Sequence, residues 1–226
     1  MRFPCAAMRR KLILAAALAI GGALVTGTSS AQKVATQIDT AAMPPGGEPP
    51  GFTFGRTGSG AAAAWRVVAD PTAAAQKAIA QISTDTTDYR FPLAVYQPIS
   101  ATNVDVVVRF KPVAGRVDQA GGIALRLTGP DDYYVVRANA LEDNVRFYRV
   151  VKGRRQEIKG FDTKVATGQW YTLGLRAEGN RFTVSFDGKA LFTAEDKTLV
   201  NPGKVALWTK ADSVTHFDTI AITPLD

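Results

Sequence analysis

The chain has 226 residues, 46% of them hydrophobic, with 27 Lys and Arg against 20 Asp and Glu, one His and one Cys. Four of the basic residues precede residue 12, so the rest of the chain carries 23 basic and 20 acidic side chains, too even a balance for a nucleic-acid-binding protein. Cys5 and His216 each stand alone, which excludes disulfides within the chain, thiolate metal sites and histidine metal clusters.

Residues 1–31 have the features of a secretory signal peptide. Arg9, Arg10 and Lys11 come before an apolar run over 12–25, and the small residues of 29–31 suit cleavage before residue 32. The apolar run is too short to span a bilayer comfortably as a helix. We therefore expect an exported protein, periplasmic or secreted, with no membrane anchor after cleavage. The Arg9-Arg10 pair leaves a twin-arginine route open beside the general secretory route.

The rest of the chain divides into a short arm and a strand-rich domain. Residues 32–51 predict a disordered or loosely ordered linker, because the Pro and Gly residues of 44–51 can neither continue a helix nor pair in a sheet. From residue 52 to 226, apolar and polar residues alternate with period two between turn residues. The predicted strands cover 65–68, 77–82, 91–96, 104–110, 122–127, 133–140, 145–151, 156–159, 171–175, 182–186, 191–194, 205–210 and 216–222.

This pattern predicts an all-β fold. In 104–110, for example, one face of the strand carries Val104, Val106, Val108 and Phe110, while Asp105 and Arg109 lie on the other. About a dozen short strands at this spacing are typical of a sandwich. We predict one domain over 52–226, in which two antiparallel sheets connected as a jelly roll hold the apolar side chains between them.

Two segments near the C-terminus carry a family resemblance. The segment 170–173 with the hairpin over 179–189, and 203–210 followed by Phe217-Asp218, resemble concanavalin A-like lectin/glucanase domains, including laminin-G-like domains. With 121–126 upstream, their order is similar to exported bacterial domains grouped with 3-keto-disaccharide hydrolases and glycoside hydrolase family 16. The resemblance covers roughly residues 50–226 and implies a concanavalin A-like jelly roll, with Trp170 as a packing residue of the core.

The same resemblance raises the question of catalysis. Family 16 hydrolases carry the pattern Glu-x-Asp-x-x-Glu on one strand, which places three acids in one cleft. No two glutamates of this chain have that spacing. Asp118, Glu142 and Asp143 are left as candidates for a general acid or base, and Glu142-Asp143 lie in a predicted turn. The catalytic residues therefore stay unknown.

A calcium ion is the one cofactor that the resemblance implies. Concanavalin A-like domains often hold calcium through an Asp on the final strand, and Asp218 has that place here. The alternative is that Asp218 caps a neighbouring loop.

The predicted strands also carry a basic and aromatic set on the faces opposite the core. An aromatic ring stacks on the flat apolar side of a pyranose, while Arg and Asn bind its hydroxyls. The alternative is that Trp208 covers a sheet edge and the arginines pair with Asp105, Asp118 or Glu142. The set consists of Arg109, Arg126, Arg137, Asn139, Arg146, Tyr148, Trp208 and Lys210.

Three functional hypotheses follow. The leading one is an exported carbohydrate-binding module without hydrolase activity, in which the basic and aromatic set binds the sugar. The second is an enzyme that hydrolyses 3-keto-glycosides with Asp118, Glu142 or Asp143 as acid or base. The third is an envelope protein-interaction or adhesion module.

Overall fold

The computed structural model describes Met1 and residues 34–226, so the predicted signal peptide lies, apart from Met1, outside the described residues. Strands and turns make up residues 34–226, and this part of the chain has no helix that is long and apolar enough to cross a membrane. The strands form two antiparallel sheets packed face to face, which confirms the predicted all-β sandwich.

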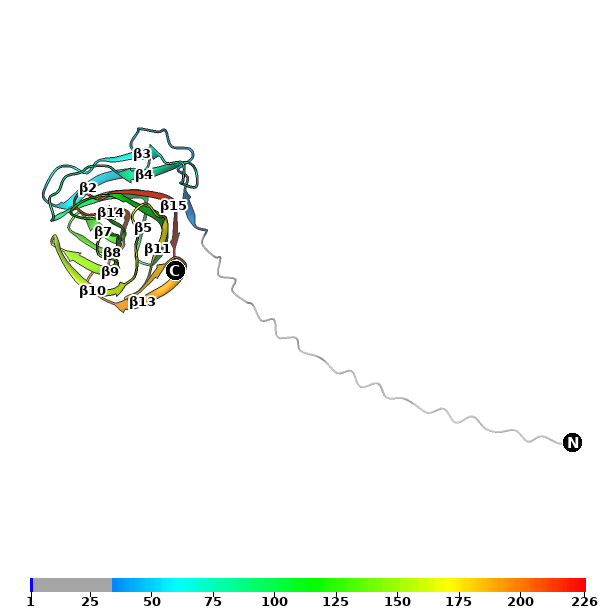
Figure 1. Ribbon diagram of the computed structural model, residues 1–226. Coiled ribbons are helices and arrows are strands. Elements are labelled where there is room, and N and C mark those ends of the chain that lie inside the picture. The colour runs from blue at the N-terminus through cyan, green and yellow to red at the C-terminus, as the bar shows by residue number, and fades with distance from the viewer. Residues whose placement is uncertain (2–33) are drawn as a thin grey trace. The chain divides into compact units, whose positions relative to one another are not determined.

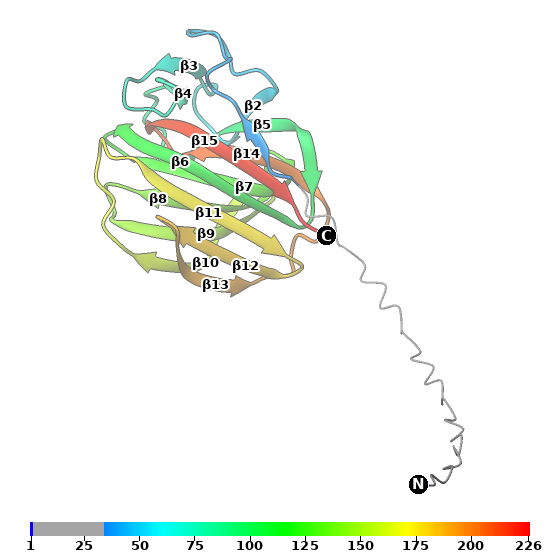
Figure 2. The same cartoon turned by 90° about the vertical axis from the view of Figure 1, so that its right-hand side faces the viewer.

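The first sheet has eight strands and the second has seven. The spatial order in the first sheet is β13 (Lys189–Glu195), β12 (Arg181–Phe186), β11 (Tyr171–Glu178), β6 (Val104–Ala114), β15 (Val214–Pro224), β4 (Lys77–Gln81) and β3 (Trp65–Ala69), and β1 (Thr36–Ile38) pairs with β15. The order in the second sheet is β10 (Arg154–Asp162), β9 (Asn144–Val151), β8 (Asp132–Asn139), β7 (Ala120–Gly129), β14 (Gly203–Thr209), β5 (Arg90–Ala101) and β2 (Phe52–Gly58). Figure 1 shows β8, β9 and β10 on one side of the molecule and β11 and β15 on the other, and Figure 2 looks onto β15, β6 and β11 of the first sheet.

The main core lies between the sheets and follows the period-two pattern. In β6, Val104, Val106, Val108 and Phe110 are at most 1% exposed and point toward the second sheet. Burying each side chain of this size contributes about 1.5–3 kcal/mol. The alternation of apolar and polar residues therefore fixes which face of each strand meets the core.

The structure differs from the loose linker that the sequence predicts over 32–51. Thr36–Ile38 pairs with the C-terminal half of β15, and Met43 is 7% exposed within the main core. Gly46 N–H donates to Val67 O and Val67 N–H donates to Gly47 O, each at 2.8 Å. The sandwich therefore begins near residue 36 and not at residue 52.

The second sheet is strongly curled, because elements near its two ends touch. Tyr89, which precedes β5, donates its hydroxyl to Gly153 O at 2.8 Å in the β9–β10 turn. Thr57 of β2 donates to Pro130 O in the β7–β8 turn. These contacts bring β2 and the start of β5 against the β7–β8 turn near the middle of the sheet and the β9–β10 turn at its other end, so the outer face of the sheet forms a hollow.

Candidate functional site

The hollow of the second sheet holds an apolar cluster of its own, which we call the second core. Trp208 is 0% exposed there and stacks on Phe91 with a ring-centroid distance of 5.3 Å. The sequence places Trp208 on the correct face, but the curl of the sheet buries it. The second core consists of Phe91, Leu93, Val95, Ala120, Ala124, Leu127, Tyr133, Val135, Tyr148, Val150, Ala206 and Trp208.

A chain of hydrogen bonds holds the second core together. Trp208 Nε1–H donates to Tyr133 Oη at 3.2 Å, and Tyr133 Oη lies 2.7 Å from Thr57 Oγ1, which donates to Pro130 O. Burial raises the pKa of Tyr133 to about 12, so its phenol stays neutral at ordinary pH. Trp208 is thus a fixed structural residue and not an exposed ring on which a sugar stacks.

Polar side chains gather beside the second core, and we call this group the rim cluster. Lys210 Nζ lies 2.7 Å from Asp88 Oδ1 and 2.7 Å from Asp118 Oδ2. Asn139 Nδ2 donates to the other oxygen of Asp118 at 2.6 Å. The rim cluster consists of Asp88, Asp118, Arg137, Asn139, Glu142, Asn144 and Lys210.

Arg137 organises the other half of the rim cluster. Its Nη2 donates to Glu142 Oε2 at 2.6 Å and to Tyr148 Oη at 3.1 Å, and its Nη1 donates to Asn144 Oδ1. The Arg137 side chain is 4% exposed, whereas the Glu142 side chain is 44% exposed. Charge-assisted bonds of this kind hold the exposed carboxylate in a defined position.

The pKa values of Asp118 and Glu142, the two carboxyl groups at the centre of the rim cluster, are shifted in opposite directions. Burial raises the pKa of Asp118 even though Lys210 acts to lower it. Burial also acts to raise the pKa of Glu142, but the charge of Arg137 and the hydrogen bonds from Asn144 and Arg137 outweigh it, so that pKa lies below its usual value. Lys210 loses solvation through burial, yet its bonds to Asp118 and Asp88 raise its pKa.

The loop before β7 sets the position of Asp118. Asp212 Oδ1 accepts the backbone N–H groups of Val117 and Asp118, each at 3.0 Å, and Asp212 Oδ2 accepts that of Arg116 at 2.7 Å. One carboxylate therefore ties three consecutive residues of the loop and aims Asp118 at Lys210.

The structure brings six of the eight predicted ligand-binding residues to the hollow and separates two from it. Of the ion pairs that the alternative names, with Asp105, Asp118 or Glu142, the arginines of the set form only the Arg137–Glu142 pair among the described residues. Arg146 pairs with a different acid, since its Nη2 lies 2.6 Å from Asp162 Oδ1. The six are Arg137, Asn139, Arg146, Tyr148, Trp208 and Lys210. Whether they bind a ligand stays a prediction.

The Arg126 side chain lies on the side of β7 that faces away from the hollow, so its expected outward orientation is wrong. The pairing of β7 with β8 shifts register after Leu125, and Arg126 has a φ of 52°. This bulge directs the guanidinium toward the main core, 5.2 Å from the centroid of Phe182. Its nitrogens donate to the carbonyls of Thr102, Gly179 and Leu199, which is a structural role.

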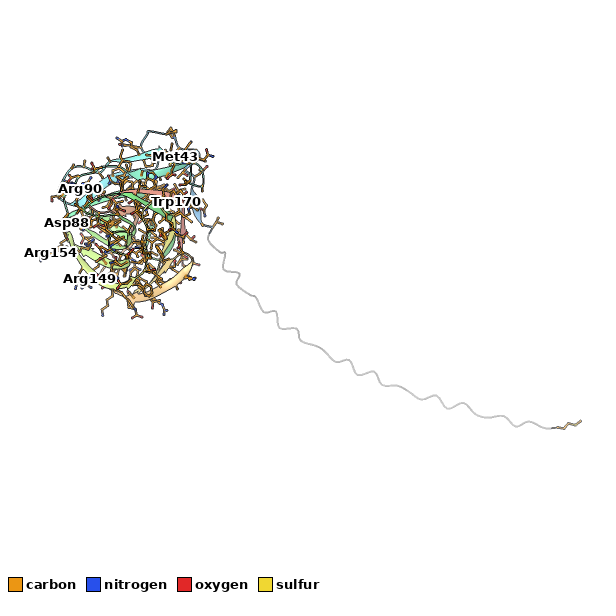
Figure 3. All side chains as sticks on the ribbon, viewed as in Figure 1. Met43, Asp88, Arg90, Arg149, Arg154 and Trp170 are labelled. Carbon is orange, nitrogen blue, oxygen red and sulfur yellow. The ribbon has the colours of Figure 1, made fainter. Side chains whose placement is uncertain are left out.

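Arg109 lies on the outer face of the first sheet, beside Trp170. The Arg109 guanidinium is 4.6 Å from the centroid of Trp170, and Lys111 Nζ is 5.0 Å from it. Trp170 Nε1–H donates to Thr72 Oγ1 at 2.9 Å. The predicted core position of Trp170 is therefore wrong, since the ring is half-buried on the surface. Trp170 lies on the opposite side of the molecule from Asp88 (Figure 3).

The surroundings of Asp218 do not fit a calcium ion. Asp218 is 0% exposed, its Oδ2 accepts Ala74 N–H at 2.7 Å, and its Oδ1 lies 3.3 Å from Arg109 Nε. A guanidinium already neutralises this carboxylate, and calcium needs several further oxygen ligands. In the described residues no three His, Cys, Asp or Glu side chains form a group that could hold a metal. The contact with Ala74 is the loop cap that the alternative reading expects.

Asp143, the third catalytic candidate, is separate from the rim cluster. Its Oδ1 accepts Val165 N–H at 3.1 Å and its Oδ2 lies 2.8 Å from Lys164 Nζ. Asp118 and Glu142 share the rim cluster, whereas Asp143 fastens the loop around Val165.

Sequence reasoning missed a pocket at the other end of the hollow. It has a volume of about 350 Å³, with Leu93, Val95 and Leu127 among its apolar lining and Thr53 and Lys204 among its polar lining. The pocket is lined in part by Thr53, Phe54 and Gly55 of β2, a strand that is absent from those predicted from the sequence. Apolar residues on both faces of β5 were the signal for a second buried layer on this sheet.

A comparison with protein family models shows to which family this chain belongs. Residues 93–225, more than half of the 226 residues, match the family model of the galactocerebrosidase C-terminal lectin domain. The chain belongs to this lectin domain family. The matched segment runs from β5 to β15 and so includes most of the hollow and the rim cluster. A comparison with curated protein sequences found no match.

Solved structures with the same fold support the lectin/glucanase resemblance. Carbohydrate-binding module CBM66 from Bacillus subtilis is 18% identical, with a TM-score of 0.59 over 75% of this chain and 94% of that one. A Bacillus licheniformis β-glucanase is 14% identical, with a TM-score of 0.54 over 87% and 100% of the two chains. A Bacillus subtilis protein with a galectin-like fold is 8% identical, with a TM-score of 0.53 over 75% and 88%. At these identities the likeness establishes the fold of this lectin-family chain.

Proposed function

We propose that the protein is an exported carbohydrate-binding module and that the rim cluster is its sugar site. The lectin domain family supports the ligand class. The observation that carries the site is the ion-paired network in which Lys210 holds Asp88 and Asp118, and Arg137 holds Glu142.

This network has the chemistry that sugar hydroxyls require. A sugar presents adjacent hydroxyl groups, each of which donates and accepts. The rim cluster offers the carboxylate oxygens of Glu142 and Asp88 as acceptors, with side chains 44% and 72% exposed, beside the ammonium donor Lys210. Because ion pairs fix these groups before a ligand arrives, binding loses little side-chain entropy. Recognition then rests on hydrogen bonds, since Trp208 is buried.

A glycan array followed by calorimetry on the purified protein tests the site. Glu142→Gln removes the charged acceptor and weakens the bond to Arg137, so we expect binding to fall at least about tenfold. Glu178→Gln is the matched control, because Glu178 is 52% exposed and pairs with Arg176 at 2.7 Å on the other sheet. Binding to no glycan, or equal losses in both variants, contradicts the proposed function.

Export is the second part of the proposal. It is supported by the signal-like sequence of residues 1–31, with cleavage before residue 32. Fractionation of cells that express the full chain, with N-terminal sequencing of the product, tests it. A protein that stays in the cytoplasm with its first residues intact contradicts this part.

Hydrolysis of 3-keto-glycosides is a second candidate, favoured by one observation. Asp118 and Glu142 share the rim cluster, and their environments shift their pKa values in opposite directions, with that of Asp118 raised and that of Glu142 lowered, as different acid and base roles require. Release of a monosaccharide from a 3-keto-disaccharide, abolished in both Asp118→Asn and Glu142→Gln, would support it. Absence of turnover would leave binding as the function. The adhesion hypothesis stays a prediction.

A further inference from the structure

Arg155 of β10 extends over the hollow and lies against three aromatic rings. Its guanidinium carbon is 4.6 Å from the centroid of Tyr148, 4.8 Å from that of Phe91 and 6.0 Å from that of Trp208. Its backbone N–H donates to Tyr89 Oη at 2.9 Å, in the contact that closes the curled sheet. Both the main chain and the guanidinium of Arg155 are therefore held in place.

The Arg155 side chain differs from its cationic neighbours in having no acidic partner. Arg137, Arg146 and Lys210 each lie within 2.7 Å of a carboxylate oxygen. In the described part of the chain, Arg155 makes no ion pair or hydrogen bond through its side chain, and its Nη1 is buried without an acceptor. Asp88 lies within electrostatic reach but is bound to Lys210.

Arg155 is next to the proposed sugar site. Tyr148 contacts both guanidinium groups, since the Arg137 guanidinium carbon is 5.7 Å from its ring centroid. Sequence reasoning missed Arg155, because the strand predicted over 156–159 begins one residue later.

The chemistry of this arrangement selects an anionic partner. A guanidinium carries five donors in one plane and no acceptor. Aromatic rings contact it through its charge and its faces, and they leave its N–H groups without strong acceptors. A carboxylate matches two of these N–H groups at once and also neutralises the charge, which a sugar hydroxyl does not.

We propose that Arg155 binds a carboxylate group of the ligand, so that the glycan recognised in the hollow is an acidic one that contains a uronic acid. This inference rests on the proposed function. It adds the ligand class and one specificity-determining residue outside the rim cluster.

The test uses matched pairs of glycans on the purified full chain. Each pair joins a neutral gluco-, manno- or galacto-oligosaccharide to its counterpart in which the terminal C6 alcohol is oxidised to a carboxylate. We expect the uronate member of the best-binding pair to bind at least about tenfold more tightly at low salt, with the advantage shrinking as salt is added. A sulfated member of the same pair shows whether any anion suffices or a planar carboxylate is required.

Variants of Arg155 separate recognition from folding. Arg155→Lys keeps the positive charge but loses the two-donor fork, so the preference for the uronate member should fall about tenfold while binding of the neutral member changes little. Arg154→Lys is the control, because Arg154 is the exposed neighbour on the other face of β10. Circular dichroism confirms that both variants are folded.

The outcomes distinguish this inference from the proposed function. If neutral members bind and their uronate partners bind no better, the protein is a neutral-sugar lectin and the inference is overturned. An unchanged preference in Arg155→Lys also overturns it. If no member of any pair binds, the proposed function fails together with the inference.

Discussion

Replacing Trp208 with Ala should cost the protein stability through the loss of the second core. Trp208 is 0% exposed, stacks on Phe91 at 5.3 Å and donates a hydrogen bond to Tyr133. Truncating a buried Trp to Ala destabilises proteins by about 3–5 kcal/mol, and the lost hydrogen bond adds about 1 kcal/mol. We expect a loss of about 4 kcal/mol, because part of the cavity collapses.

Urea unfolding followed by far-UV circular dichroism measures this loss without depending on Trp fluorescence. With an m-value of about 2 kcal/mol/M, the midpoint should fall by about 2 M. Trp170→Ala is the matched control, because Trp170 is half-buried on the outer face of the first sheet and contacts Arg109 and Lys111. Its loss should be about 1–2 kcal/mol.

The contrary result is a Trp208→Ala protein within about 1 kcal/mol of the parent that has lost glycan binding. It would mean that the ring is an exposed stacking platform, as the sequence alone suggests, and that the hollow is open in solution.

Three further predictions concern the other buried elements. Arg126→Met should destabilise the fold by about 2–4 kcal/mol in the same urea assay, because three carbonyl groups lose their hydrogen-bond donor. The control Arg146→Met should cost at most about 1 kcal/mol, since the Arg146 side chain is 21% exposed in the parent protein. Burial acts to raise the pKa of Asp70, but hydrogen bonds from Lys111, His216 and Thr72 hold that pKa well below 3.8 in the folded protein. The ionised Asp70 therefore stabilises the fold at pH values above its pKa in the unfolded chain, and this stabilisation is lost as the pH falls. The stability gap between the parent and Asp70→Asn should therefore shrink between about pH 5 and pH 2, and a constant gap would contradict the assignment. A chain that begins at residue 52 should be about 3–5 kcal/mol less stable than one that begins at residue 34, because it loses the buried side chains of Ile38 and Met43, and equal midpoints would restore the loose-linker prediction.

Sequence periodicity predicted most of the fold because one face of nearly every strand is buried. The strands expected between residues 65 and 222 all form, and the main core has the residues that alternation indicates. Alternation is informative here since a one-residue slip would expose the whole apolar face of a strand.

The two N-terminal strands were not predictable in the same way. β1 is three residues long, and β2 contains Gly55 and Gly58. Both are held by main-chain pairing with strands that lie far away in sequence, β15 and β5. A Pro- and Gly-rich composition does not reveal that distant partners will order the segment, because the stabilising contacts are absent from the local pattern.

The candidate site was predictable by face but not by exposure. Periodicity places Trp208, Arg137 and Lys210 on one side of the second sheet, as observed. Their burial depends on the contacts of Tyr89 and Thr57 with distant turns, which curl the sheet. The bulge at Arg126 could not be predicted from the alternation either, because a regular strand and a bulged strand can have the same order of apolar and polar residues.

Trp170 and Trp208 show that strand register sets the face of a side chain in this fold, whereas sheet curvature sets its exposure. Tyr171, Leu173 and Leu175 all point into the main core, so period two alone places the preceding Trp170 on the outer face, where it lies. The expectation that Trp170 packs in the core came from the family resemblance and not from the alternation. For Trp208 the alternation predicted the correct face of the strand, but the burial of that face results from the curvature of the second sheet, which depends on contacts between residues far apart in the sequence. Site residues in this family should therefore be assigned from strand register first, and their exposure from the turns that meet across the hollow.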